Sequence, residues 1–478
     1  MKPTPRTTPA DWHGLARDLD GDVLRPGDGG YELARLPYNS RFDIHPQAVV
    51  LARRVEDVQQ TLAFARRHRL PLAPRSGTHC YGGWSTSPGI TLDLSAMNTV
   101  TTEGSAATGT ATVGGGALLI DVYDALLAED RSIPAGSCPT VGIAGLTLGG
   151  GLGSVCRAYG LTCDRLASAV VVTADGRIRE CSADREPELF WALRGGGGGN
   201  FGVVTGFTFR THPTTVITTA SLEWNWRDTE RVLDAWQRWA PAQPDEVWSC
   251  LGLNADATAG CTVQAHLYVL GERLDVAEQL VAAVGLPPVG QSNRTVSYRE
   301  MIMSMTGVHG PVALMQLTGR TPDGVLDRPP FVATSNFFPH HLPPAGVHAL
   351  VASVTRRAAD GGSGYVLLDS LRGAVGRVPR DATAFAHRDA LFSAQYHCTY
   401  EPGTPAAVLD DAARWLRELR RTMRPWAGDR AYVNYADPQL ADHARAYYGA
   451  NLPRLAAAKA AYDPDGLFDF PHAVPARA

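Results

Sequence analysis

Three glycine-dense segments hold the residues whose types and spacing could do chemistry. The first, APRSGTHCYGGWS at residues 73–85, places His79 inside a loop of small residues. Small side chains let backbone N–H groups approach an anion closely, as a pyrophosphate requires. The imidazole would then stand beside the bound ligand. The alternative is a turn with a solvated histidine, and this segment on its own leaves both open.

The second segment, GSCPTVGIAGLTLGGGLGSVCRAYGLTCD at residues 136–164, presents a bare backbone suited to a flat or phosphorylated ligand. Its spacing is not that of a Rossmann loop. After Gly151 and Gly153, the third glycine position of GxGxxG is occupied by Cys156. No GKS or GKT occurs either, which excludes a P-loop.

The third segment, LRGGGGGNFGVVT at residues 193–205, contains five consecutive glycines, which are costly in backbone entropy. A flexible linker is the alternative. Linkers are polar, however, whereas Trp191, Phe201 and Val203 flank this segment. We therefore expect these glycines to serve a site that needs a bare backbone.

The elements that must position these segments begin with a βαβ unit. Apolar runs at residues 48–54 and 90–98 predict strands, and the spacing of Val58, Leu62 and Ala65 predicts a helix between them. From about residue 213 the pattern changes to apolar residues at every second position, interrupted by helices. This alternation indicates an α+β region set apart from the first part.

Composition and charge exclude several classes of protein. The 478 residues carry a net charge of −4, so there is no basic footprint for nucleic acid. No run of about 18 apolar residues exists to span a membrane, and residues 1–22 lack the apolar core of a signal peptide. The eight cysteines form no CxxC pair. We expect a cytoplasmic protein with no metal site, since His340 and His341 have no further ligand at suitable spacing.

Taken together, the segments resemble the berberine-bridge-enzyme-like oxidases of the vanillyl-alcohol-oxidase superfamily. Six motifs occur in family order between about residues 36 and 470: RSGTHCYGGWS, GSCPTVGIAGLTLGGGLG, RAYGLTCD, WALRGGGGGNFGVV, YVNYAD and YYGANLPRL…YDP. The resemblance implies an α+β fold with a two-part FAD-binding domain, residues 1–211 and 422–478. It also implies a substrate-binding domain, residues 212–421, with a large, mainly antiparallel sheet flanked by helices.

The same resemblance implies bicovalently attached FAD. His79 matches the histidine bonded to the flavin 8α-methyl group, and Cys138 matches the cysteine bonded to flavin C6. Cys80 is nearer to His79, but adjacent side chains of an extended loop point apart, so we prefer Cys138. Many members have glycine where this chain has Thr78. The cofactor-binding residues expected from the motifs are Arg75, Ser76, Gly77, Thr78, His79, Cys80, Cys138, Gly142, Gly145, Gly149, Gly153, Val203 and Asn434.

The YVNYAD motif supplies the candidate catalytic residues, Tyr432 and Tyr435. In alcohol-oxidising members the second tyrosine deprotonates the substrate hydroxyl while hydride passes to flavin N5, which maps to Tyr435. A free tyrosine has a pKa of about 10, so a positive charge or hydrogen-bond donors must lower it. Both tyrosines can face the flavin only if this strand is broken, since Tyr432 and Asn434 would otherwise share the opposite face. Packing as core aromatic residues is the alternative.

Candidate substrate contacts lie mostly in the middle of the chain, where structural roles are the alternative for each. Strand alternation places Gln395 and His397 on one face and Tyr396 on the other. Leu152 stands where several sugar-oxidising relatives carry an aromatic residue, which weakens a sugar-oxidase interpretation and leaves a more apolar site. The full set of candidates is Leu152, Asp369, Arg372, Gln395 and His397.

The expected function is an FAD-dependent oxidase in a bacterial natural-product pathway. It would oxidise an alcohol or related carbon of a small molecule, or form a ring or double bond, and reduce O2 to H2O2. An oxygenating or rearranging flavoenzyme acting on a polyketide-like substrate is one alternative. A flavin-carrying, drug-sequestering resistance protein is another, although its mark would be loss of the base motif, and YVNY is intact. No sequence pattern predicts the oligomeric state.

Overall fold

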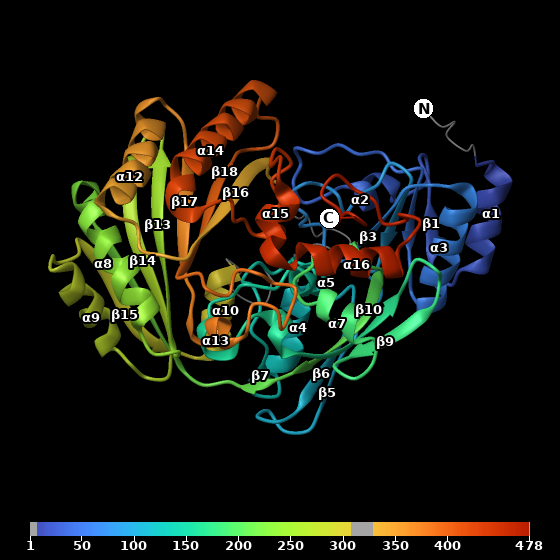
Figure 1. Cartoon of the computed structure of the whole chain (residues 1–478), viewed down its shortest axis with the longest axis horizontal. Coiled ribbons are helices and arrows are strands. Elements are labelled where there is room, and N and C mark those ends of the chain that lie inside the picture. Colours follow the sequence, from blue (N-terminus) through green and yellow to red (C-terminus); the bar gives the residue numbers. More distant parts are fainter. Residues whose placement is uncertain (1–6, 307–327, 478) are drawn as a thin grey trace.

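Strands with apolar residues at alternating positions form a seven-stranded sheet, the largest among the described residues. One face of this sheet forms a wall of the cavity described below. The structure is a computed structural model that describes residues 7–306 and 328–477 (Figure 1). Within them, seven antiparallel strands pair in the order β15-β12-β14-β13-β17-β18-β16. They are β12 (Ile217–Trp224), β13 (Val247–Asp256), β14 (Gly260–Leu270), β15 (Gly290–Val296), β16 (Phe331–Phe338), β17 (Gly364–Ser370) and β18 (Phe392–Thr399).

Long amphipathic helices cover one face of this sheet (Figure 1). Between sheet and helices lies an apolar core that includes Leu253, Val366, Tyr396 and Leu416. Because side chains alternate along a strand, the residues between these core positions point to the opposite face, toward the N-terminal part of the chain. The covering helices are α8 (Thr229–Ala242), α9 (Asp275–Val284), α12 (Pro344–Ala359) and α14 (Ala406–Ala427).

Two smaller sheets organise the N-terminal part. One has the order β1-β2-β4-β3, and both β2 and β3 run parallel to β4. The other is antiparallel, with the order β5-β6-β10-β8-β9. The strands are β1 (Asp22–Leu24), β2 (Ala48–Leu51), β3 (Leu72–Arg75), β4 (Ile90–Asp93), β5 (Val100–Glu103), β6 (Thr110–Gly114), β8 (Leu166–Val172), β9 (Ile178–Ser182) and β10 (Val203–Arg210).

The predicted helix of the βαβ unit is present as α3 (Val55–His68), and Val58, Leu62 and Ala65 are fully buried on it. The other helices of this part are α1 (Pro9–Asp18), α2 (Tyr31–Arg35), α4 (Leu119–Leu127), α5 (Ile143–Leu148), α6 (Cys156–Tyr159) and α7 (Pro187–Ala192). Short elements complete the description: β7 (Arg131–Ser132), β11 (His212–Pro213), α10 (Tyr298–Thr306), α13 (Gly373–Arg377), η1 (Thr162–Arg165), η2 (Trp226–Asp228), η3 (Val433–Tyr435) and η4 (Gly449–Asn451). None of the helices in the described residues is long and apolar enough to cross a membrane.

The C-terminal segment returns to the N-terminal part through α15 (His443–Tyr448) and α16 (Leu452–Tyr462) (Figure 1). Buried Lys459 anchors α16 to the third glycine segment, because its Nζ donates to Asn200 O at 2.9 Å. The same Nζ donates to Asp463 Oδ2 at 2.7 Å. Helix α16 ends directly before the Asp463-Pro464 dipeptide, as the sequence predicts. The α+β fold is thereby confirmed, with N- and C-terminal segments packed together.

Two buried arginines clamp the N-terminal part to the large sheet. The guanidinium of Arg388 donates to both carboxylate oxygens of Asp164, at 2.7 Å each. Arg157 on α6 donates to Val247 O at 2.7 Å and to Leu371 O. These contacts hold strand β13 and the end of β17 against the second glycine segment, and so set the width of the space between them.

Candidate active site

A cavity of about 840 Å³ lies between the large sheet and the N-terminal part. All three glycine segments and the YVNYAD segment reach it, although they are far apart in the sequence. The expected site residues that line it are Arg75, Ser76, Gly77, His79, Cys80, Cys138, Gly142, Gly145, Leu152, Gly153, Asp369, Gln395, Tyr432, Asn434 and Tyr435.

Three of the expected site residues, Val203, Arg372 and His397, do not line the cavity. Val203 begins β10 and is fully buried in the apolar core beneath the first sheet. Arg372 is exposed at the start of α13. His397 does share the face of Gln395, but its ring stacks between Phe331 and Tyr365, at centroid distances of 4.9 and 5.0 Å. The structure therefore does not bring these three residues to the cavity lining.

Two further expected residues act on the loops instead of lining the cavity. The carbonyl of Thr78 accepts from Tyr38 N at 3.0 Å, which fixes the backbone just before His79. Gly149 is needed for close packing, because a Cβ there would collide with the side chain of Asn434. Both residues support the site from outside the cavity lining.

Two glycine loops meet at Gly77 and Gly142. A Cβ on Gly142 would collide with Gly77 N and with the side chain of Ser76, and a Cβ on Gly77 would collide with Gly142 N. Only glycine permits this backbone approach, which brings His79 of the first loop next to residues 138–142 of the second.

His79 is held as a neutral imidazole beside the second loop. Its Nε2 lies 2.7 Å from Thr140 Oγ1, and its ring stacks on Tyr38 at a centroid distance of 3.8 Å. Burial lowers the pKa of His79 to about 3, with a smaller contribution from the charge of Arg328. A neutral imidazole retains a nitrogen lone pair at physiological pH, which covalent attachment to a flavin methyl group requires.

The two cysteines near His79 occupy different parts of the cavity. Cys138 is open to the cavity but enclosed by surrounding protein, which raises the pKa of its thiol. It is near enough to raise the pKa of Tyr435 electrostatically. Cys80 instead influences Tyr447, near the C-terminal end of the chain. Cys138 is therefore the cysteine that shares its surroundings with the catalytic candidates.

The YVNYAD segment is a 3-10 turn, η3, and not a strand. The turn lets Tyr432 and Tyr435 both line the cavity. Tyr432 Oη accepts from Gly151 N at 3.0 Å and from Asn434 Nδ2 at 3.0 Å, so it anchors the turn to the second glycine segment. Tyr435 packs edge-on against Tyr432 and stacks on Tyr81, at centroid distances of 4.9 and 5.4 Å.

The electrostatics of Tyr435 differ from what a phenolate base requires. Burial raises the pKa of Tyr435 well above 10, and the nearby Asp369 raises it further. None of the charges found to influence it in the described residues is a cation. Burial also raises the pKa of Asp369 from 3.8 to about 7, offset in part by a 3.4 Å hydrogen bond from Ser393 Oγ. The protein thus places a neutral phenol beside a carboxyl group that titrates near neutrality.

Sequence reasoning missed Tyr81, Thr140 and the aromatic residues of the sheet wall. Tyr81 Oη accepts from Gln395 Nε2 at 2.8 Å, so it links the first loop to β18 and to Tyr435. Its position two residues after His79, in a glycine segment, was the available signal. For Trp248 and Tyr365 the strand pattern was visible, but no local pattern tells which face of a strand meets a ligand.

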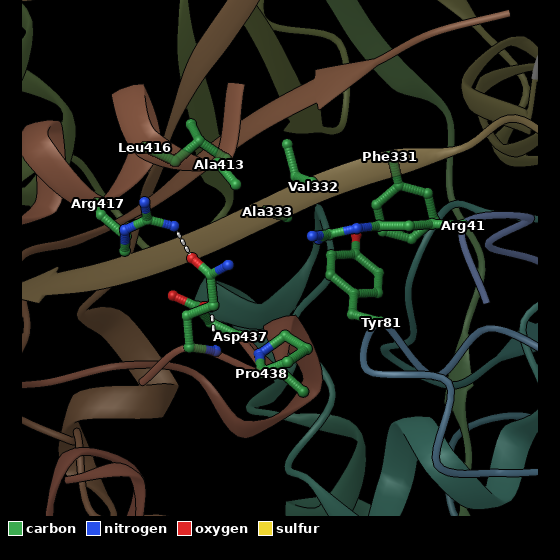
Figure 2. A pocket seen from close by; sticks show the side chains of 12 residues that line it. Arg41, Tyr81, Phe331, Val332, Ala333, Ala413, Leu416, Arg417, Asp437 and Pro438 are labelled. Atoms are coloured by element: carbon green, nitrogen blue, oxygen red, sulfur yellow. Dashed lines mark hydrogen bonds between the residues drawn. The ribbon is translucent and has the colours of Figure 1, made fainter. Parts of the chain in front are cut away.

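A second, small pocket shares two lining residues, Tyr81 and Ala436, with the large cavity (Figure 2). Its volume is about 20 Å³, room for about one water molecule. Arg41 and Arg417 line it, and Arg417 donates to Gln439. This pocket is too small for a substrate, so the large cavity is the candidate active site.

The residues of the large cavity fit FAD. Buried hydroxyls of Ser76, Ser85 and Thr86 line it and have no hydrogen-bond partner among the described residues. Such groups suit phosphate, ribityl or ribose oxygens. A Cβ on Gly145 would meet no atom within 4 Å, so this glycine opens onto free space in the cavity. The volume also lies within the range of cofactor sites.

Comparison with known proteins agrees with this geometry. A family model described as "FAD binding domain" matches residues 46–182, and one described as "Berberine and berberine like" matches residues 431–475. The "Uncharacterized FAD-linked oxidoreductase YgaK" of Bacillus subtilis is 31% identical over 468 residues, which cover 96% of this chain and 97% of that protein.

Solved structures show the same likeness. The wild-type BBE-like 1 of Physcomitrella patens has a TM-score of 0.87 at 28% identity, covering 99% of this chain and 100% of that one. Glucooligosaccharide oxidase from Acremonium strictum, described as carrying 6-S-cysteinyl, 8α-N1-histidyl FAD, has a TM-score of 0.85 at 25% identity, covering 98% and 100%. Sequence motifs, fold and cavity agree with these relatives, and the chain belongs to the berberine-bridge-enzyme-like family of FAD-linked oxidoreductases.

Proposed function

We propose that the protein is an oxidase that holds FAD through His79 and Cys138 and oxidises a hydroxyl-bearing carbon of a small molecule in a bacterial natural-product pathway. When bound, the flavin accepts two electrons from that carbon and passes them to O2, giving H2O2. The observation that carries the proposal is the convergence of Cys138, Tyr435 and Asp369 on one cavity.

Proton removal from the substrate falls to Tyr435 and Asp369 acting together. With a pKa well above 10, the phenol of Tyr435 is protonated at neutral pH and can orient the substrate hydroxyl by hydrogen bonding. Asp369, with a pKa of about 7, is the nearby group whose carboxylate form is populated under working conditions. Tyr435 thus passes the proton from the substrate toward Asp369, and the role of free phenolate base is not required of it.

The cavity wall restricts the substrate class. Arg75 is the only arginine or lysine among the described residues that line it, and its Nε is paired with Asp93 at 2.8 Å. Arg328 adds a second positive charge, which is close enough to lower the pKa of His79. Trp248 and Tyr365 from the large sheet supply aromatic surface. This aromatic surface supports a ring compound that carries a hydroxyl group, such as a glycosylated polyketide or a hydroxylated alkaloid.

Anaerobic flavin bleaching against sugars, glycosylated polyketides and hydroxylated alkaloids tests this function. Tyr435→Phe should slow bleaching by about 10²–10⁴-fold, since it removes the hydroxyl that orients and relays the proton. Unchanged turnover in Tyr435→Phe would exclude that role.

The same assay separates the two alternative functions. One H2O2 released per product excludes an oxygenating or rearranging enzyme that consumes oxygen without net peroxide. A compound that binds tightly and returns unaltered, with no flavin reduction, would favour a drug-sequestering protein instead.

Mass spectrometry of a tryptic digest tests the two covalent bonds. Trypsin should release residues 76–131, which contain His79, joined through the one flavin to residues 132–157, which contain Cys138, because no lysine or arginine lies inside either range before its last residue. Fragmentation should place the flavin on His79 and Cys138, and not on Cys80 or Cys156 of the same peptides. Flavin found only in the supernatant after acid precipitation would contradict covalent attachment.

A further inference from the structure

We propose that Thr140 is the positioning residue for flavin attachment: its hydroxyl holds Nε2 of His79 and so selects Nδ1 as the nitrogen that bonds to the flavin. This inference rests on the proposed attachment at His79. Thr140 does not touch the reacting atoms in this scheme. It acts through the orientation and tautomer of the imidazole.

The geometry around the imidazole leaves one nitrogen available. Nε2 lies 2.7 Å from Thr140 Oγ1, while Nδ1 makes no hydrogen bond within the described part of the chain. Tyr38 covers one face of the ring at a centroid distance of 3.8 Å, with only 17° between the planes. A flipped ring would exchange nitrogen for carbon at the position facing Thr140 and lose this hydrogen bond. Thr140 is itself buried, so no water can readily replace its hydroxyl.

The tautomer follows from the donor and acceptor rules of the imidazole. A neutral histidine carries its proton on one nitrogen and a lone pair on the other. If Thr140 Oγ1 accepts from Nε2–H, the lone pair lies on Nδ1, which is then the nucleophile. Burial keeps the ring neutral, with a pKa of about 3, so this lone pair is present at any physiological pH.

The attachment balances with O2 as the oxidant. A bond forms between Nδ1 and the 8α carbon, and one C–H bond of that methyl group breaks. The electron pair of that C–H bond passes into the flavin ring system, which is reduced. The protons from the methyl group and from Nε2 complete the reduced ring, and O2 then removes two electrons and two protons as H2O2. The adduct and the reoxidised flavin remain.

A hydroxyl group can form a hydrogen bond with Nε2 of His79 both before and after the attachment. Before attachment, Thr140 accepts a hydrogen bond from Nε2–H. After attachment, Nε2 has lost its proton and is an acceptor, to which the same hydroxyl can donate by rotating its hydrogen. A valine of nearly the same shape can do neither. Serine retains both capacities, so Thr140→Ser is the conservative variant.

The test compares tryptic peptides of the purified wild-type protein with those of Thr140→Val, Thr140→Ser and Thr147→Val. Thr147 is a matched control, since its hydroxyl is also buried but has no hydrogen-bond partner in the described residues. Flavin on the His79 peptide should fall at least about tenfold in Thr140→Val and change less than about threefold in the other two variants. Flavin should stay on the Cys138 peptide in Thr140→Val, which shows that the variant folds and binds FAD.

Two results would overturn the inference. One is a wild-type level of His79 adduct in Thr140→Val. The other is a Thr140→Ser variant that loses the adduct as completely as Thr140→Val does. If the wild-type protein itself carried no flavin on His79, the proposed attachment would fail first, and the role of Thr140 with it.

Discussion

Replacing Asp369 by asparagine tests whether this buried carboxyl group controls proton removal. Its pKa is raised to about 7, so the wild-type protein should lose kcat/KM as the pH falls below about 7, because a protonated Asp369 cannot accept a proton. Asparagine keeps the size of the side chain and cannot ionise. Asp369→Asn should therefore show no such acidic limb, and its rate should stay about 10²–10⁴-fold below the wild-type maximum.

The same substitution has a signature that needs no substrate. Because the folded-state pKa is raised above the ordinary 3.8, the stability that this proton contributes is fully present below pH 3.8 and is lost as the pH rises to about 7. From pH 5 to pH 7 the loss amounts to roughly 2 kcal/mol, because the slope of about 1.4 kcal/mol per pH unit falls to half as the pH reaches the pKa of about 7. The Asp369→Asn protein does not undergo this loss, because asparagine does not ionise. Its free energy of unfolding relative to wild type should therefore rise by that amount between pH 5 and pH 7.

Stopped-flow flavin bleaching between pH 5 and 9, with the compound that reduces the flavin fastest, measures the kinetic limb. Denaturant unfolding of both proteins at pH 5, 6 and 7 measures the stability difference. Ser393→Ala is the control: it removes the 3.4 Å hydrogen bond that lowers the pKa of Asp369, so the limb should move upward by less than about one pH unit. Parallel pH profiles and parallel stabilities for wild type and Asp369→Asn would refute the reasoning.

Two further predictions concern the framework of the site. Gly142→Ala should sharply lower the share of flavin that stays covalently bound after acid precipitation, because its Cβ would collide with Gly77 N and push the two loops apart; undiminished covalent flavin would contradict this. Asp164→Asn should lower the unfolding free energy by about 3–5 kcal/mol, because buried Arg388 loses its counter-charge, whereas Asp234→Asn in an exposed ion pair should change it by less than about 1 kcal/mol. Equal effects of the two asparagine variants in denaturant unfolding would show that burial is not the deciding factor.

Much of the fold was predictable because its signals are local. The stripe of Val58, Leu62 and Ala65 identified α3, and the Asp-Pro dipeptide after Tyr462 identified the end of α16. The YVNYAD segment was harder. A period-2 interpretation set Tyr435 opposite Tyr432, and the hydrogen bonds from Gly151 and Asn434 to Tyr432 Oη, which anchor the 3-10 turn, cannot be read from neighbouring residues.

Some residues of the candidate site were likewise predictable from local sequence, and others were not. The first glycine-dense segment pointed to His79, since a backbone that must approach a ligand closely leaves glycine in the sequence itself, whereas Cys138 followed from the family resemblance. The structure places Val203, Arg372 and His397 outside the cavity lining, because strand position or charge alone does not tell where a side chain lies.

By itself, the amino-acid sequence determined the family and the order of the glycine loops, and the resemblance it carries predicts that His79 and Cys138 bond to the flavin. The tertiary structure decided that Thr140 holds Nε2 of His79 and that burial raises the pKa of Asp369 to about 7. It also decided that burial and Asp369 raise the pKa of Tyr435, with no cation among the main influences found in the described residues. The physical reason is the separation along the chain of the groups that interact. Turn and helix preferences act between neighbours in the chain, whereas a pKa depends on burial, and a hydrogen-bond partner can lie far away in the sequence, as Thr140 lies 61 residues from His79.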